Sequence, residues 1–140
     1  MSQVNEILNL FFKKKTVLYQ IESDGKKTKI KDTTKESRSY PVVILVNNIT
    51  ASSSEILATS FRENYKNVVL VGTNTFGKGS VQKNIPLGNG SSYKYTVQKW
   101  YTAKGVFIDN NGITPDIVIE KDHNPDVDSQ LLEAISILKK

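Results

Sequence analysis

The 140-residue chain contains no cysteine and only one histidine. Disulfide scaffolds, thiol nucleophiles and cysteine-ligated zinc sites are therefore excluded. Long apolar runs are also missing, since none approaches the ~18 residues that a membrane span requires. Residues 1–15 lack the early basic region and the unbroken apolar stretch of a signal peptide, so any export signal would belong to a longer parent chain. We expect no cofactor, no metal and no direct membrane span.

Length and composition predict a single globular domain over residues 1–140. Hydrophobic residues make up 38% of the chain and charged residues 24%, as in ordinary soluble domains. The formal net charge is +5, and much of it comes from lysines at 13–15, 26–35 and 139–140. These lysines lie at the ends of elements and in a loop rather than along one binding element. We therefore favour a solvated surface over a nucleic-acid site.

The apolar pattern predicts an α/β chain with a central βαβ unit. Residues 42–46 and 68–71 are apolar at every position, which is typical of parallel strands covered on both faces. Residues 53–64 between them have helical periodicity, so the crossover should be right-handed. The other expected elements are a helix at 4–12, strands at 16–21, 28–31, 81–87, 93–102 and 117–119, and a helix at 128–138.

Two features of the C-terminal half make this prediction specific. Gly88-Asn89-Gly90 separates two strand-like segments and is a strong signal for a β-hairpin. The closing helix at 128–138 is amphipathic, and its apolar face consists of Leu131, Leu132, Ile135 and Leu138.

Residues 72–80, GTNTFGKGS, partly match a phosphate-binding loop. Gly72, Gly77 and Lys78 fit the pattern G-x-x-x-x-G-K-[ST], but Gly79 stands where the hydroxyl residue should be. A phosphate loop must also lead into a helix, whose N-terminus holds the anion. Here the sequence SVQKNIPL follows, and its alternation is that of a strand. Nucleotide binding is thereby disfavoured, and the loop taken alone would be a glycine-rich turn with Lys78 on the surface.

A second motif, NNITASSSEI at residues 47–56, follows one apolar strand and opens the next helix. A hydroxyl residue there would lie at the carboxyl edge of the sheet, where α/β proteins place ligands. The free N–H groups of the helix N-terminus could stabilise an oxyanion beside it. The simpler interpretation is a serine N-cap, with Glu55 complementing the helix dipole.

A serine nucleophile needs a base, and the chain offers two candidates. His123 lies in a polar loop, and we expect it on the surface. A lysine can act as the base when burial lowers the pKa of its ammonium group. Lys78 follows the second strand of the βαβ unit, so its loop should meet the serines at the same sheet edge.

At these residues the sequence resembles the carboxy-terminal processing peptidases, also called tail-specific proteases. The resemblance covers about residues 4–120 and is carried by four ordered motifs: VNNITASSSEI (46–56), VGTNTFGKGSVQ (71–82), KWYTAKG (99–105) and NGITPDI (111–117). It implies a ClpP/crotonase-like βαβ core with a mixed sheet, flanking helices and a C-terminal β-hairpin. It also implies a serine endopeptidase that cleaves near protein C-termini.

The resemblance assigns roles to particular residues. The family's S-A-S-A-S-E pattern falls on residues 50–55, so its middle serine, the nucleophile, is Ser52. The F-G-K-G lysine, the general base, is Lys78, and the glutamine that helps to orient it is Gln82. The backbone N–H of Ser53 would be one oxyanion donor.

Two departures leave the nucleophile open between Ser52 and Ser53. Ser53 replaces the usual alanine, and Lys78 lies 26 residues after Ser52, one more than we expect. An insertion near residues 63–67 would explain the extra residue, whereas a slip of the alignment by one would make Ser53 the nucleophile. We favour Ser52 because residues 54–56 align without a gap.

A larger departure concerns what precedes the helix at 4–12. Family members carry there a strand with an N-x-G-G turn that supplies another oxyanion donor, and this turn is absent. The PDZ module and the cap are absent too. We therefore expect the C-terminal part of a catalytic domain, excised from a longer extracytoplasmic protein and nearly inactive by itself.

Three other expectations concern partners and the rival function. The substrate should be a protein or a peptide, and the sequence does not identify it. An exposed sheet edge could pair two copies as a homodimer. The rival to the peptidase is a non-catalytic binding or scaffold domain of a peptidase-like protein.

Overall fold

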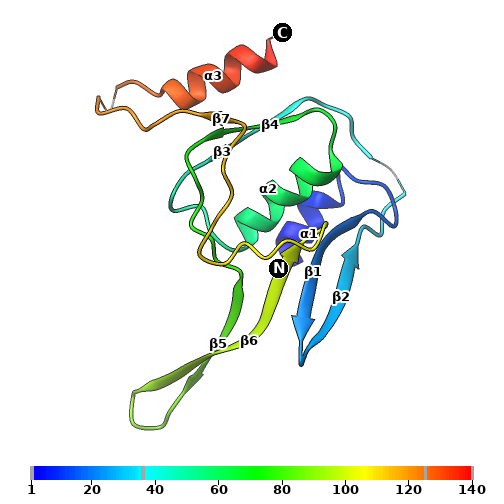
Figure 1. The fold of residues 1–140 in the computed structure, drawn as a ribbon, viewed down its shortest axis with the longest axis vertical. Helices are drawn as coiled ribbons and strands as arrows, with labels where there is room; N and C mark the ends of the chain where they lie inside the picture. The colour runs from blue at the N-terminus through cyan, green and yellow to red at the C-terminus, as the bar shows by residue number, and fades with distance from the viewer. Residues whose placement is uncertain (1, 36, 125, 140) are drawn as a thin grey trace.

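The computed structural model of the chain describes residues 2–35, 37–124 and 126–139. Its helices and strands, in chain order, are α1 (Ser2–Leu8), β1 (Val17–Ser23), β2 (Lys26–Lys31), β3 (Val42–Val46), α2 (Ser53–Asn64), β4 (Val68–Gly72), β5 (Ser80–Pro86), β6 (Ser92–Thr102), β7 (Ile117–Val118) and α3 (Ser129–Leu138). The strands form two sheets, one parallel and one antiparallel (Figure 1).

The parallel sheet has the order β3-β4-β7 and contains the βαβ unit. β3 and β4 pair in register from Val42 opposite Val68 to Val46 opposite Gly72, and α2 connects them. Leu70 and Val71 of β4 are completely buried. The carboxyl ends of β3 and β4 therefore lie side by side, and the serine motif and the GTNTFGKGS loop start from neighbouring positions.

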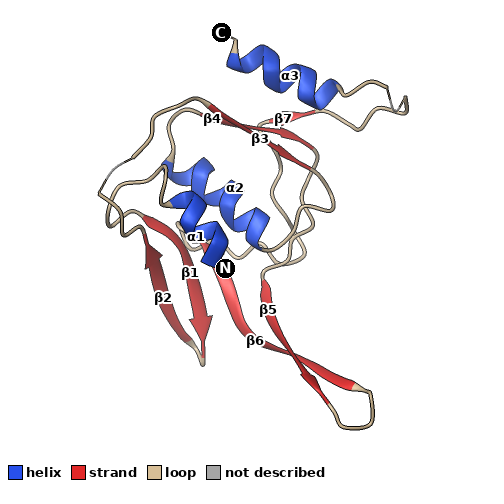
Figure 2. Ribbon diagram, turned by 180° about the vertical axis from the view of Figure 1, so that it is seen from behind, coloured by secondary structure: helices blue, strands red, loops and turns tan. Residues whose placement is uncertain are grey.

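The antiparallel sheet has the order β2-β1-β6-β5. β5 and β6 form a hairpin whose distal end, around Gly88–Gly90, extends away from the rest of the chain (Figures 1 and 2). Its proximal end is held in the core, where Trp100 of β6 is completely buried. The hairpin therefore starts beside the loop that carries Lys78 and ends in solvent.

Helices α1 and α2 lie between the two sheets (Figure 2). The core there is built from buried apolar side chains of both helices, among them Leu8, Ile56 and Phe61. The ring of Phe61 has its centroid 5.0 Å from that of Phe11 and 5.2 Å from that of Phe12. Aromatic edge contacts of this kind add to the burial of apolar area.

The α/β class, the βαβ unit and the hairpin that the sequence predicts are confirmed. α2 has the predicted bounds, whereas α1 ends at Leu8 rather than at residue 12. The parallel and antiparallel strands belong to two separate sheets. Among the described helices, none has the length and apolarity to cross a membrane.

α3 forms as predicted, but its apolar face is not buried. Its buried residue is Ala134, which faces the side of the helix that contacts β3 and β4. Four apolar side chains on the rest of its surface are exposed: Leu131, Leu132, Ile135 and Leu138. Hydrophobic periodicity reveals that a helix has an apolar face, but it does not reveal whether a neighbouring element covers that face.

The N-terminus of α3 is held by two aspartates. The Asp128 side chain accepts the N–H of Leu131 at 2.9 Å as the N-cap. The Asp122 carboxylate accepts the backbone N–H of Ser129 at 2.7 Å and the Ser129 hydroxyl at 2.9 Å. These bonds from the Ser129 backbone and hydroxyl lower the pKa of Asp122.

The lowered pKa gives the start of α3 a dependence on pH. A carboxyl whose folded pKa is lowered contributes stability that is present above its ordinary value of about 3.9 and is lost as the pH falls through the folded value. We therefore expect Asp122→Ala to speed amide hydrogen exchange in residues 129–132 near pH 6 but to have little effect near pH 2. Asp126→Ala, in the same loop, is the control. An equal effect of Asp122→Ala at both pH values would contradict this assignment.

Candidate active site

Ser52 occupies the turn between β3 and α2 and is the N-cap of the helix. Its φ of 57° and ψ of −116° lie outside the regions that non-glycine residues ordinarily adopt. Such a conformation costs on the order of 1–3 kcal/mol and persists only where the surroundings enforce it. A strained serine just before the helix is also a feature of the nucleophile elbow in α/β-hydrolases, although here six residues, 47–52, separate β3 from α2.

Ser53 and Ser54 begin the regular helix and have exposed side chains. The N–H groups of Ser54 and Glu55 donate to the carbonyls of Ala51 and Ser52. The N–H of Ser53 has no hydrogen-bond partner within the described part of the chain. An unpaired N–H therefore lies directly beside Ser52, as expected for the first turn of a helix.

The carboxylate of Glu55 joins the serine turn to the lysine loop. Glu55 is completely buried at the third position of α2. Its Oε2 accepts the N–H of Ser52 at 2.8 Å and the N–H of Lys78 at 2.9 Å. Its Oε1 accepts the N–H of Gly77 at 2.7 Å and the Thr75 hydroxyl at 2.6 Å. One oxygen atom thus binds the backbones of both Ser52 and Lys78, and hydrogen bonds to a charged acceptor are the stronger ones.

The backbone of Lys78 is held from the other side by β6. Its carbonyl accepts the indole N–H of Trp100 at 2.7 Å, and the Trp100 backbone N–H donates to Gly79 at 2.9 Å. The N–H of Gly79 donates to the Asp109 carboxylate at 2.8 Å. Lys78 itself is half-buried. Its Cα position is therefore fixed by neighbours on both sides, and the side chain starts from a defined point.

The loop that ends in Lys78 is packed backbone to backbone against residues 108–112. Gly77 has a φ of 81°, and a Cβ at this position would come within 2.6 Å of the Gly112 nitrogen. The Asn110 N–H donates to the Gly77 carbonyl at 2.8 Å, and the Ile113 N–H donates to the Thr75 hydroxyl at 2.8 Å. Only glycine fits Gly77, because both the positive φ and the close approach exclude a side chain.

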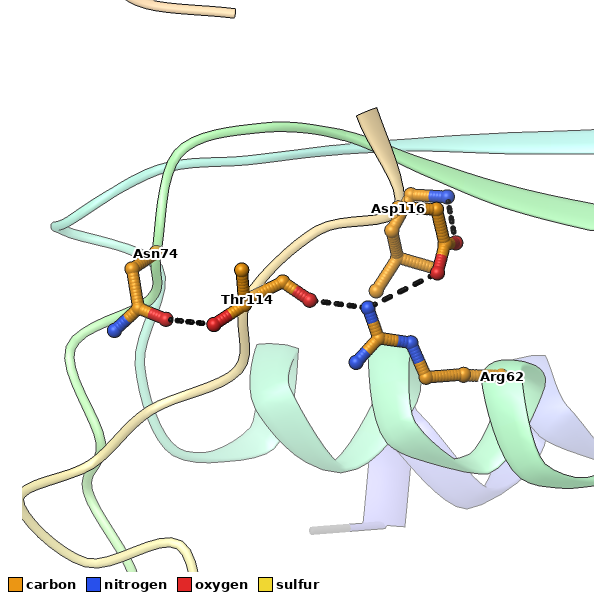
Figure 3. A network of polar contacts seen from close by, with 5 residues as sticks. Arg62, Asn74, Thr114 and Asp116 are labelled. Carbon is orange, nitrogen blue, oxygen red and sulfur yellow. Dashed lines mark hydrogen bonds and ion pairs between the residues drawn. The ribbon is translucent and has the colours of Figure 1, made fainter. Parts of the chain in front are cut away.

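The NGITPDI segment is anchored to α2 and β4 by a polar network (Figure 3). Arg62 of α2 donates to the Thr114 carbonyl and lies 3.2 Å from Asp116 Oδ1. The other Asp116 oxygen accepts the Leu70 N–H at 2.8 Å, and the Thr114 hydroxyl donates to Asn74 at 3.0 Å. This segment supports the loop that carries Lys78 from behind.

An open cavity of about 600 Å³ lies over the lysine loop. Its apolar lining includes Ala51 and the side chains of Ile49 and Phe76, which are 80% and 62% exposed. Its polar lining consists of Lys78, Ser80, Gln82, Lys94, Asp109 and Asn110. Ser52 follows Ala51 directly in the chain. A cavity with both apolar and polar lining can hold a segment of peptide.

The structure brings the predicted residues together at one sheet edge. The backbones of Ser52 and Lys78 both bond Glu55, Ser53 follows Ser52 in the first turn of α2, and Gln82 lines the same cavity as Lys78. The loop at 72–79 leads into β5 rather than a helix, which excludes the phosphate-loop interpretation. Sequence reasoning missed the joint roles of Glu55 and Thr75. The spacing S-x-x-E predicts only the hydrogen bond that the Ser52 N–H donates to the Glu55 carboxylate.

Comparison with known proteins gives a consistent result. The model of peptidase family S41 matches residues 1–119. The carboxy-terminal processing protease CtpA of Bacillus subtilis (strain 168) is 40% identical over 121 residues, which are 86% of this chain and 26% of that protein. CtpB of the same organism is 38% identical over 122 residues, 86% of this chain and 25% of that protein.

A solved structure, that of a photosystem II D1 C-terminal processing protease, superposes with a TM-score of 0.71 at 28% sequence identity. The match covers 96% of this chain and 34% of that protein. The chain thus spans about a quarter of the length of the two Bacillus relatives.

Removal of the Glu55 carboxylate should destabilise the whole fold. Glu55→Ala leaves four buried or half-buried donors without an acceptor, and each costs about 1–3 kcal/mol. We expect a loss of at least about 3 kcal/mol in the free energy of unfolding, measured by urea denaturation. Glu63→Ala on the same helix is the control, since it removes one exposed bond to the Lys104 N–H and should cost less than about 1 kcal/mol. Equal losses in the two variants would contradict the central role of Glu55.

Proposed function

Because the chain belongs to peptidase family S41, we propose that it carries a Ser–Lys dyad that hydrolyses peptide bonds near protein C-termini. Ser52 is the nucleophile and Lys78 is the general base. The observation that carries this proposal is the shared hydrogen bonding to Glu55 Oε2, which fixes the backbones of Ser52 and Lys78 beside each other. A nucleophile and its base must be held at a defined separation, and a shared acceptor for both backbones supports such a pairing.

The reaction follows from the proposed roles. The amine of Lys78 takes the proton of the Ser52 hydroxyl, and the oxygen attacks the carbonyl carbon of the scissile bond. The resulting oxyanion is stabilised by the unpaired N–H of Ser53. As the C–N bond breaks, the Lys78 ammonium returns the proton to the leaving amine. Water, with its proton taken by Lys78, then hydrolyses the acyl-enzyme and releases a carboxylate and free Ser52.

Backbone geometry supports Ser52 over Ser53 as the nucleophile. Ser52 has the strained conformation of an elbow, whereas Ser53 lies in the regular first turn of α2. Strain at a functional position is retained only when the surroundings enforce it, and Glu55 supplies that enforcement at Ser52. Gln82, which lines the same cavity as Lys78, is proposed to orient the Lys78 side chain.

Substrate, location and assembly are proposals that rest on the family resemblance. The substrate is a protein or a peptide, and the location is extracytoplasmic. β2 and β5 are the outer strands of the described antiparallel sheet, so pairing of two copies through a sheet edge stays a prediction. The second candidate function is a non-catalytic scaffold that uses the same cavity only to bind peptide.

Substitution of the dyad separates these two functions. In the full-length protein that contains these residues, Ser52→Ala and Lys78→Ala should each lower kcat/KM for a peptide substrate by at least about 10³-fold. Ser53→Ala keeps the N–H donor and should stay within about tenfold of the wild type. Unchanged turnover in both dyad variants would favour the scaffold, and a large loss in Ser53→Ala alone would move the nucleophile to Ser53.

The purified 140-residue chain should be nearly inactive by itself. The sequence has no N-x-G-G turn, and one missing oxyanion donor lowers kcat by about 10²–10³-fold. Steady-state cleavage of a fluorogenic peptide, compared with a family member that carries the turn, measures the difference. Vigorous cleavage by the 140-residue chain, abolished in Ser52→Ala, would refute this expectation.

A further inference from the structure

We propose that Lys94 forms a cationic subsite of the cavity that binds a carboxylate of the substrate several residues from the scissile bond. This inference rests on the proposed function, because it assigns a recognition role beside the proposed dyad. The carboxylate can belong to an acidic side chain or to a free C-terminus, and the chemistry that recognises it is the same.

The register of the hairpin places Lys94 on the same face as Gln82. β5 and β6 are antiparallel, with Gln82 opposite Thr96 and Asn84 opposite Lys94. Side chains of directly opposed residues point to the same face, and alternate residues along a strand do so as well. Gln82 and Lys94 are therefore diagonal neighbours on one face, with Cα atoms roughly 7–8 Å apart. Both line the cavity over Lys78.

Neighbouring residues of the hairpin face the other way. Lys83 lies opposite Tyr95, on the face that Tyr93 shares, and these residues are not among those that line the cavity. The rings of Tyr93 and Tyr95 stack there with centroids 5.5 Å apart. Alternation along the strands thus places Lys83 of β5 and Lys94 of β6 on opposite faces of the hairpin. Of these two lysines, only Lys94 lines the cavity.

The charge of Lys94 is not neutralised by a neighbour. Within the described residues the ion pairs are Lys27 with Glu22 and Arg62 with Asp116, and neither involves Lys94. The one carboxylate on the cavity wall, that of Asp109, accepts the Gly79 N–H through Oδ1 and lies 3.3 Å from the Asn110 amide through Oδ2. No ion pair within the described residues occupies the Lys94 ammonium, so a carboxylate of a bound peptide can serve as its counter-charge.

The hairpin places Lys94 at a distance from the proposed dyad. Gln82 comes four residues after Lys78, and Lys94 lies roughly 7–8 Å beyond Gln82 on the neighbouring strand. Because an extended peptide advances about 3.3 Å per residue, the bound carboxylate lies several residues from a carbonyl held at Ser52 and Lys78. Because the attraction between Lys94 and the carboxylate is electrostatic, the preference for an acidic peptide should decrease as the salt concentration rises.

The test compares matched peptides on matched variants. In the full-length protein that contains these residues, kcat/KM is measured for peptide pairs that carry Glu or Gln at one position, scanned from the second to the sixth residue on either side of the scissile bond. A further pair has a free or an amidated C-terminus. We expect the wild type to favour one acidic member by about tenfold at low salt. Lys94→Gln should abolish this preference, Lys94→Glu should reverse it, and Lys83→Gln, the control on the opposite face, should retain it.

The same peptides are also titrated against Ser52→Ala by fluorescence anisotropy, with and without Lys94→Gln. A preference for the acidic peptide that Lys94→Gln removes supports the subsite even if the proposed dyad fails its own test. A preference that survives Lys94→Gln overturns the inference. So does an equal loss for both members of a pair, or a shift of the pH profile shared by both, because either would mean that Lys94 acts on the dyad and not on the substrate.

Discussion

The buried carboxylate of Glu55 is the interaction on which the rest of the site depends. A charge without contact to solvent is stable only when its lone pairs are used, and four donors use them. Two of these donors belong to the backbones that present Ser52 and Lys78. The need to satisfy one buried acid therefore sets the relative position of two residues that are far apart in the sequence.

The segments around this carboxylate form a layered support. The loop that carries Lys78 is packed against residues 108–112, where Gly77 permits backbone contact, and against Trp100 of β6. The NGITPDI segment is in turn fixed to α2 by Arg62. All four motifs that carry the family resemblance thus contain residues with a supporting role, while the proposed chemistry resides in Ser52, Lys78 and Gln82.

The β5–β6 hairpin extends from this rigid support into solvent. Trp100 buries the proximal end of the β5–β6 hairpin, whereas the distal end extends from the body. The hairpin thus brings Gln82, the proposed orienting residue, and the charge of Lys94 to the cavity. Membership of peptidase family S41 is the basis of the proposed reaction class, and the side chains that line the cavity are the features that would distinguish one peptide from another.

The sequence by itself determined the elements, the βαβ crossover, the hairpin and the candidate residues, because periodicity and turn chemistry are local. It also placed Ser52 and Lys78 at one sheet edge, since the carboxyl ends of adjacent parallel strands coincide. It could not reveal that Glu55 bonds Thr75, Gly77 and Lys78, nor that α3 leaves Leu132 exposed. Only the tertiary structure decided these points, because bonding across 20 or more residues and the covering of a helix face depend on how separate elements pack.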